Sequence, residues 1–255
     1  MSEDNIMGAH EEHPYYHAHH FHSMEQQNAS AKLGMWGFLV QELLFFAGLF
    51  MAYIAMRFFY PETFELVQHK NLLSIPWGAT NTVVLLTSSL TMALAVRAAQ
   101  MLPIRKNEEE KKIRKHLMSY LMVTCVFAGM FLVIKYVEYS HKIHDGLLPG
   151  KFYSYEAWKA NIDPEGRTFG GVVGEGGDVI MTEAPQIFFS IYFMMTGVHG
   201  LHVVIGVGVI LWLYLRTLRG EFNSENYAAV ENVGLYWHLV DLIWIFLFPL
   251  LYLVQ

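Results

Sequence analysis

The chain of 255 residues has little cysteine and little charge. Its single cysteine, Cys125, excludes an intrachain disulfide and any metal cluster built from several cysteines. Charged residues make up 16% of the chain, whereas a soluble domain usually carries about 25%. Hydrophobic residues make up 54% and gather in long runs, which is typical of a membrane protein.

Residues 1–30 also lack the basic start and apolar stretch of a cleavable signal peptide, so we expect none. They include "HEEHPYYHAHHFH", which is rich in histidine. Such a tract is a compositional signal. We expect a disordered tail, with metal capture as the alternative.

Five apolar runs are long enough to cross a hydrocarbon layer of ~30 Å, which takes about 20 helical residues. We predict these spans at roughly 33–57, 79–100, 116–140, 185–215 and 232–254. The expected fold class is therefore all-α: a polytopic five-helix transmembrane bundle that occupies residues 31–255.

Basic residues predict the orientation of this bundle. They concentrate in "MLPIRKNEEEKKIRKH", between the second and third spans. Because loops rich in Lys and Arg stay on the inner side, we expect the N-terminus inside and the C-terminus outside. The long segment 141–184 then forms an outer loop, whose length suggests local structure or a docking role.

Ionisable residues occur inside the predicted spans, where a mid-bilayer charge costs at least ~2.5–3.5 kcal/mol and must find partners. They are Glu42, Lys135, Glu138, His199, His202, His238 and Asp241. Residues three apart share one helix face. Three such pairs occur: Lys135/Glu138, His199/His202 and His238/Asp241. Each could lock helix packing or take part in proton or lipid binding.

A metal site among these residues is not expected. Di-iron bundles use two Glu-x-x-His motifs plus two further glutamates, and no Glu-x-x-His or His-Glu-x-x-His occurs within a span. A haem held by two histidines would need facing histidines on the fourth and fifth spans. We instead expect Asp241 and His238 to pair with each other or with the fourth-span histidines, where Gly197, Gly200 and Gly206 allow close approach.

Several segments resemble subunit III of haem–copper terminal oxidases, the cytochrome c oxidase type. They are "LGMWGFLVQELLFFAGLF", "NTVVLLTSSLTMA", "FAGMFLVIKYVEYSH", "TGVHGLHVVIGVGVILWLYLR" and "YWHLVDLIWIFLF", in the family's order from about residue 32 to the end. The longer family form has two additional N-terminal helices that are absent here. Any lipid cleft must therefore be smaller or completed by another chain.

The resemblance implies a non-catalytic subunit without haem or copper of its own, beside a catalytic subunit I that holds them and reduces oxygen to water. Such a subunit supports proton uptake, protects subunit I during turnover, and holds phospholipid on a path for oxygen. By position, Glu42 is similar to the family's intramembrane carboxylate. His202 and Arg216 are similar to its lipid contacts, and Arg216 could instead be an ordinary positive-inside anchor.

The expected partners are subunit I, other oxidase subunits, phospholipid and, through 141–184, an electron-donating respiratory complex. We expect no nucleic-acid partner, and a location in a bacterial cytoplasmic membrane. Two other function classes stay open: an autonomous proton channel or transporter, and a membrane metalloenzyme. A transporter usually shows an inverted repeat or broken helices, which this sequence lacks.

Overall fold

The computed structural model describes residues 21–69, 73–102, 108–154, 172–173, 179–180, 184–222 and 227–253. Within these residues, five helices are long and apolar enough to cross a membrane, which confirms the five predicted spans. The His-rich stretch before residue 21 lies outside the described residues, as does most of 155–183.

The spanning helices are longer than the apolar runs alone indicated. They are α1 (Met24–Phe59), α3 (Ile75–Met101), α4 (Glu108–His144), α6 (Ala184–Leu218) and α7 (Ala228–Phe248), which continues as the short π-helix η3 (Pro249–Leu253). Helix α2 (Pro61–His69) follows α1. The polar residues that flank each apolar run continue its helix, so the helices extend beyond the predicted spans.

Local sequence signals account for several helix ends. Ser23 caps α1 by accepting a hydrogen bond from the Gln26 backbone N–H at 3.2 Å, and the Gln26 side chain accepts one from the His22 N–H at 2.9 Å. Proline stands at the first position of α2 and the second position of α3, where its missing N–H costs no helical bond. Pro249 marks the change from α-helix to π-helix.

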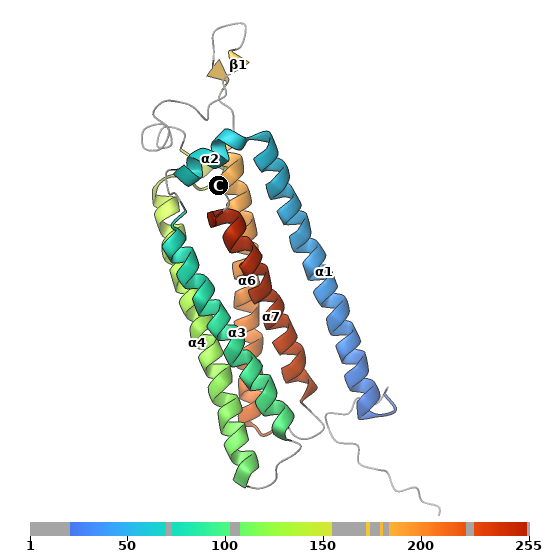
Figure 1. Cartoon of the computed structure of the whole chain (residues 1–255). Coiled ribbons are helices and arrows are strands. Elements are labelled where there is room, and N and C mark those ends of the chain that lie inside the picture. Colours follow the sequence, from blue (N-terminus) through green and yellow to red (C-terminus); the bar gives the residue numbers. More distant parts are fainter. Residues whose placement is uncertain are drawn as a thin grey trace, which may run out of the picture.

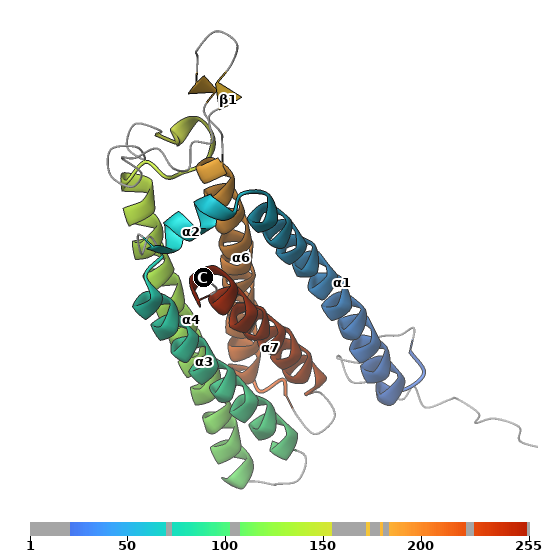
Figure 2. The ribbon, with the colours of Figure 1, turned by 45° about the horizontal axis from the view of Figure 1, so that its top comes forward.

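Four helices form a tight bundle and α1 stands at its edge. Figures 1 and 2 show α3, α4, α6 and α7 packed together and α1 set apart on one side, beside α6 and α7. The buried centre holds large aromatic side chains, among them Phe131, Trp237 and Trp244. Helix α2 and the end of α7 lie at one end, here called the α2 end. The other end, where α3 leads to α4 and α6 to α7, is called the basic end.

Glycine permits close contact at one of the three predicted positions on α6. A Cβ on Gly206 would lie 2.6 Å from Trp237 on α7, so only glycine fits against that ring. A Cβ on Gly200 would meet nothing within 4 Å, and one on Gly197 would meet only Tyr139 of α4 at 3.8 Å. The expectation that these glycines bring α6 and α7 together is therefore confirmed for Gly206 and wrong for Gly197 and Gly200.

The segment 141–184 contains some local structure. Helix α4 extends into it as far as His144, and the 3-10 helix η2 (Gly150–Phe152) follows. Two short strands, β1 (Val172–Val173) and β2 (Val179–Ile180), pair antiparallel, with Val172 opposite Ile180. The hairpin lies beyond the α2 end of the bundle (Figure 1).

Candidate functional site: polar groups inside the bundle

Glu42 on α1 and His202 on α6 form a direct pair, each near the middle of its helix. His202 Nε2 lies 2.9 Å from Glu42 Oε2, and His202 Nδ1 lies 2.8 Å from the Val198 carbonyl oxygen. The side chains are 15% and 13% exposed, so little solvent competes for the contact. This pair is one of the polar links between the edge helix α1 and the bundle.

The hydrogen bonds limit the protonation of this pair. A carbonyl oxygen can only accept, so His202 Nδ1 carries a hydrogen and donates it to Val198. The contact between Nε2 and Glu42 then requires one more proton, placed either on the carboxyl group or on the imidazole. Both arrangements have zero net charge. The pair can therefore move a proton between its members without creating a buried charge imbalance.

His238 and Asp241 do not pair with each other. His238 Nδ1 lies 2.7 Å from Ser89 Oγ of α3. Asp241 is 3% exposed, and neither carboxylate oxygen has a hydrogen-bond partner among the described residues. The prediction that the two would bond to each other or to histidines of α6 is wrong. The reason is that α3 packs along this face of α7 and supplies Ser89 as the nearer partner.

His199 is also buried without a hydrogen bond to any described residue. Its ring centroid lies 5.5 Å from that of Phe131 and 5.2 Å from that of Trp244. His199 and His202 thus share a helix but differ in their surroundings, because one faces aromatic rings and the other faces Glu42. Among the described residues, no three of the His, Cys, Asp and Glu side chains are grouped in a way that could hold a metal ion.

Lys135 and Glu138 form the predicted ion pair, with Lys135 Nζ 2.8 Å from Glu138 Oε2. The structure adds three members. Lys142 Nζ lies 3.1 Å from Glu138 Oε1. The hydroxyls of Tyr192 on α6 and Tyr252 on η3 donate to the same oxygen at 2.9 and 2.7 Å. This buried group, called the Glu138 cluster, ties α4, α6 and η3 together toward the α2 end.

Arg216 lies near the end of α6 at the basic end. Its Nε donates to Glu221 Oε2 at 2.6 Å. Its guanidinium carbon lies 4.7 Å from the Trp212 ring centroid and 5.1 Å from that of Phe222. The residue is thus held by an ion pair and by two aromatic rings, a partly buried setting for an interfacial cation.

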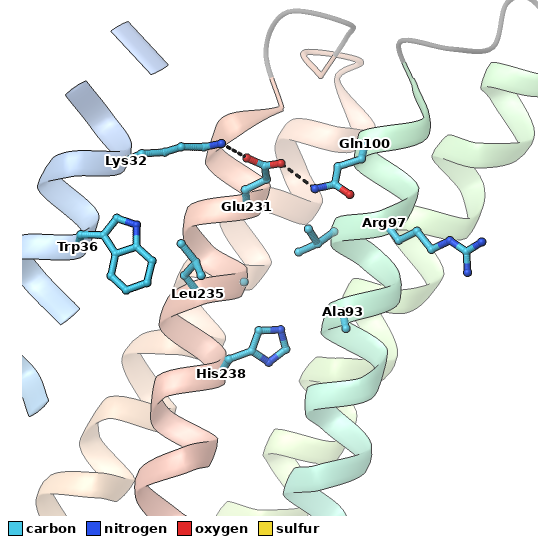
Figure 3. Close-up of a pocket in the computed structure, with 10 residues that line it drawn as sticks. Lys32, Trp36, Ala93, Arg97, Gln100, Glu231, Leu235 and His238 are labelled. Atoms are coloured by element: carbon cyan, nitrogen blue, oxygen red, sulfur yellow. Dashed lines mark hydrogen bonds and ion pairs between the residues drawn. The ribbon is translucent and has the colours of Figure 1, made fainter. Parts of the chain in front are cut away.

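A pocket of ≈ 400 Å³ opens at the basic end between α1, α3 and α7. Its polar lining residues are Lys32, Arg97, Gln100, Glu231 and His238, with Trp36 beside them. Lys32 of α1 reaches Glu231 of α7 at 2.9 Å, and Gln100 of α3 donates to the other Glu231 oxygen at 2.8 Å (Figure 3). His238 lies deeper in the pocket than this bridge (Figure 3).

Sequence reasoning missed the partners that come from other helices. Ser89, Tyr192 and Tyr252 bond to predicted site residues, yet nothing in their local sequence marks them. Lys142 could have been found, because it stands four residues after Glu138 on a helix that continues to His144. Glu231 and Lys32 meet only because α1 and α7 run side by side at the basic end.

Comparison with known proteins gives a consistent result over most of the chain. The family model described as cytochrome c oxidase subunit III matches residues 10–158 and 176–255. A cytochrome c oxidase subunit 3 of Thermostichus vulcanus is 30% identical over 87% of this chain and 86% of its own. A probable quinol oxidase subunit 3 of Staphylococcus saprophyticus is 25% identical over 88% of each chain. A cytochrome c oxidase subunit 3 of Loxodonta africana is 28% identical over 88% of this chain and 69% of its own.

Proposed function

Because the chain belongs to the cytochrome c oxidase subunit III family, it is a non-catalytic subunit of a haem–copper oxidase complex, and we propose that it supports proton uptake and lipid binding beside the catalytic subunit. Oxygen reduction takes place on other subunits. The contribution of this chain then comes from its own polar groups and from the surfaces it offers to subunit I, to the other oxidase subunits and to phospholipid.

The Glu42–His202 pair carries this proposal. It joins the edge helix α1 to α6, and both residues stand near the middle of helices long enough to cross a bilayer. One proton is shared across a 2.9 Å contact between a carboxyl group and an imidazole. Accepting or releasing a proton changes the net charge of the pair by one, so exchange with the surroundings is driven by a charge that changes nearby. The pair thus serves as an exchangeable proton store at the junction of α1 and α6.

Lipid binding is proposed for the same side and for Arg216. Side chains on the outer face of α1 are apolar and exposed, including Leu44 and Met51 at 67% each. Acyl chains would cover that face, and oxygen dissolves better in hydrocarbon than in water. At the basic end, the Arg216 guanidinium can donate to a lipid phosphate through its terminal amino groups while its Nε keeps Glu221.

The proposal also includes an orientation and a location for the chain, which rest on its basic residues. With the basic end on the inner side of a bacterial cytoplasmic membrane, Arg216 meets the inner phosphate layer. The hairpin of β1 and β2 then lies on the outer side, where an electron-donating complex can reach it. Glu42, His202 and Asp241 lie near mid-membrane.

Replacement of Glu42 by glutamine tests the proposal. The amide keeps the size of the side chain and can donate to His202 Nε2, but it cannot exchange a proton. In the purified oxidase complex, we expect Glu42→Gln to keep assembly and to reduce proton uptake or turnover lifetime by less than about tenfold, because the chemistry stays in the catalytic subunit.

Glu110→Gln provides the matched control, since Glu110 is a partly exposed carboxylate at the start of α4 that pairs with Arg114. It should leave both quantities unchanged. Loss of the complex in Glu42→Gln would make Glu42 a structural residue. If the variant assembles and keeps normal proton uptake and normal turnover lifetime, the Glu42–His202 pair takes no part in proton exchange.

A further inference from the structure

Asp241 is a buried acid that the Glu42–His202 pair does not explain. It is 3% exposed near the middle of α7, and its two oxygens have no hydrogen-bond partner among the described residues. An ionised carboxylate in that setting would lose its hydration without compensation, which is costly. The neutral acid is cheaper to bury, and in the folded chain it can exchange its proton only through neighbouring groups.

The side chains beside Asp241 form a route for such exchange. Ser89 of α3 is close enough to Asp241 to act on its carboxyl group, although no hydrogen bond joins the two in this structure, and its Oγ is 2.7 Å from His238 Nδ1. His238 and Asp241 are three residues apart on α7, so Ser89 lies between two side chains of one helix face. A hydroxyl can donate one hydrogen bond while accepting another, which lets it pass a proton in either direction.

His238 also reaches the pocket at the basic end. The pocket of ≈ 400 Å³ includes His238 in its lining, and Figure 3 shows the imidazole extending from α7 toward α3, below the Lys32–Glu231–Gln100 bridge. At about 30 Å³ per water molecule, a volume of this size has room for roughly a dozen waters. Lys32, Gln100 and Glu231 offer those waters polar contacts near the mouth.

We propose that this pocket is a hydrated path for protons and that Asp241 is a proton-binding site loaded from it through His238 and Ser89. A hydronium ion in the pocket protonates the imidazole. His238 Nδ1 then gives its proton to Ser89 Oγ as the Ser89 hydroxyl proton passes to the Asp241 carboxylate. The net result converts hydronium to water and carboxylate to carboxylic acid, and His238 and Ser89 end neutral.

This site is separate from the pair assigned above. Glu42 and His202 lie between α1 and α6, whereas the Asp241 route uses α3 and α7. The polar and charged groups that face the route come from three helices: Ser89, Arg97 and Gln100 from α3, Glu231 and His238 from α7, and Lys32 from α1. Failure of one proposal therefore leaves the other standing, and the two can be tested on the same preparation.

Infrared spectroscopy of the intact oxidase complex tests the proposal directly. A protonated buried carboxyl group gives a C=O stretching band that Asp241→Asn should remove and Glu42→Gln should leave in place. If Asp241→Asn does not assemble, Asp241→Glu keeps the acid and should shift the same band. The absence of any band that depends on residue 241, across the range of pH in which the complex is stable, would overturn the assignment.

The path is tested by the rate at which that band shifts after transfer to D₂O. Ala93 is an exposed residue that lines the pocket, so Ala93→Phe should fill it. We expect Ala93→Phe and Ser89→Ala each to slow the deuterium shift by about tenfold or more. Leu90→Phe adds an aromatic ring at an exposed position of α3 outside the pocket lining and should not slow it. An unchanged rate in Ala93→Phe and Ser89→Ala would refute the path.

Discussion

Lys142 donates to Glu138 from one helical turn further along α4, although Glu138 already holds Lys135. The two Nζ–O distances are 3.1 and 2.8 Å, and all three side chains are more than nine-tenths buried. Two lysines thus share one carboxylate, which also accepts from two tyrosine hydroxyls. Lys135 further lies 4.7 Å from the Trp244 ring centroid. An aromatic ring and the Tyr252 hydroxyl thus help to stabilise Lys135, which shares its carboxylate with Lys142.

The first prediction concerns this cluster. Glu138→Gln removes the charge that both lysines use, so two buried cations lose their partner, and we expect a loss of about 3–5 kcal/mol in stability. Lys135→Gln should cost less, since Lys142 still neutralises Glu138. Thermal unfolding of the subunit in mild detergent measures which of the two variants loses more stability. Lys111→Gln, in an exposed pair with Glu108, is the control and should change stability by less than about 1 kcal/mol. Equal losses of stability in Glu138→Gln and Lys111→Gln would show that the Glu138 cluster does not stabilise the bundle.

A second prediction concerns the contact of α6 with α7. Gly206→Ala places a methyl group 2.6 Å from Trp237 in the unrelaxed structure, and overpacking of this kind costs about 1–3 kcal/mol. Gly200→Ala adds the same methyl group where nothing lies within 4 Å and should be neutral or slightly stabilising. The melting temperatures of the two variants should therefore differ. Similar values for both would show that α6 and α7 are not in this register.

A third prediction concerns His199. Its nitrogens bond to no described residue and its ring lies among aromatic side chains, so replacement by an apolar side chain removes an unsatisfied polar group. His199→Leu should leave the melting temperature unchanged or raised, with normal turnover of the complex. A marked loss of stability would mean that His199 bonds to water or to a ligand, and a loss of turnover alone would give it a functional role.

A fourth prediction concerns the segment between α4 and α6. Deletion of residues 155–178 spares Gly150, whose carbonyl oxygen accepts from Gln186 at 3.4 Å. If this segment docks an electron-donating complex, the oxidase should assemble normally and lose activity only with that donor, while an artificial electron donor restores turnover. Normal activity with the natural donor would exclude the docking role.

The sequence was sufficient for features that depend on one helix. Runs of apolar residues predict the five spans because about 20 residues are needed to cross a bilayer. Lys135 and Glu138 could be paired because a helix places residues three apart on one face. Thr82 and Thr87 of α3 likewise need only their own helix, because each hydroxyl donates to the carbonyl oxygen four residues earlier.

Contacts between helices could not be predicted in the same way. Periodicity gives the face of a helix but neither its neighbour nor its axial register. His238 was therefore assigned to Asp241 or to α6, whereas it bonds Ser89 of α3. Glu42 and His202 were each identified on their own, and their pairing became visible only once α1 and α6 were placed side by side. Orientation in the membrane stays a prediction from the basic residues.

The most direct measurement is an inventory of the complex purified through a tag on this chain, by mass spectrometry and visible absorbance. We expect a haem-bearing catalytic subunit in equal amount, bound phospholipid, and an isolated chain that is colourless and free of iron and copper. Iron or copper held by the isolated chain through His199, His202 or His238 would contradict a non-catalytic subunit, as would oxygen reduction or proton conduction by this chain alone.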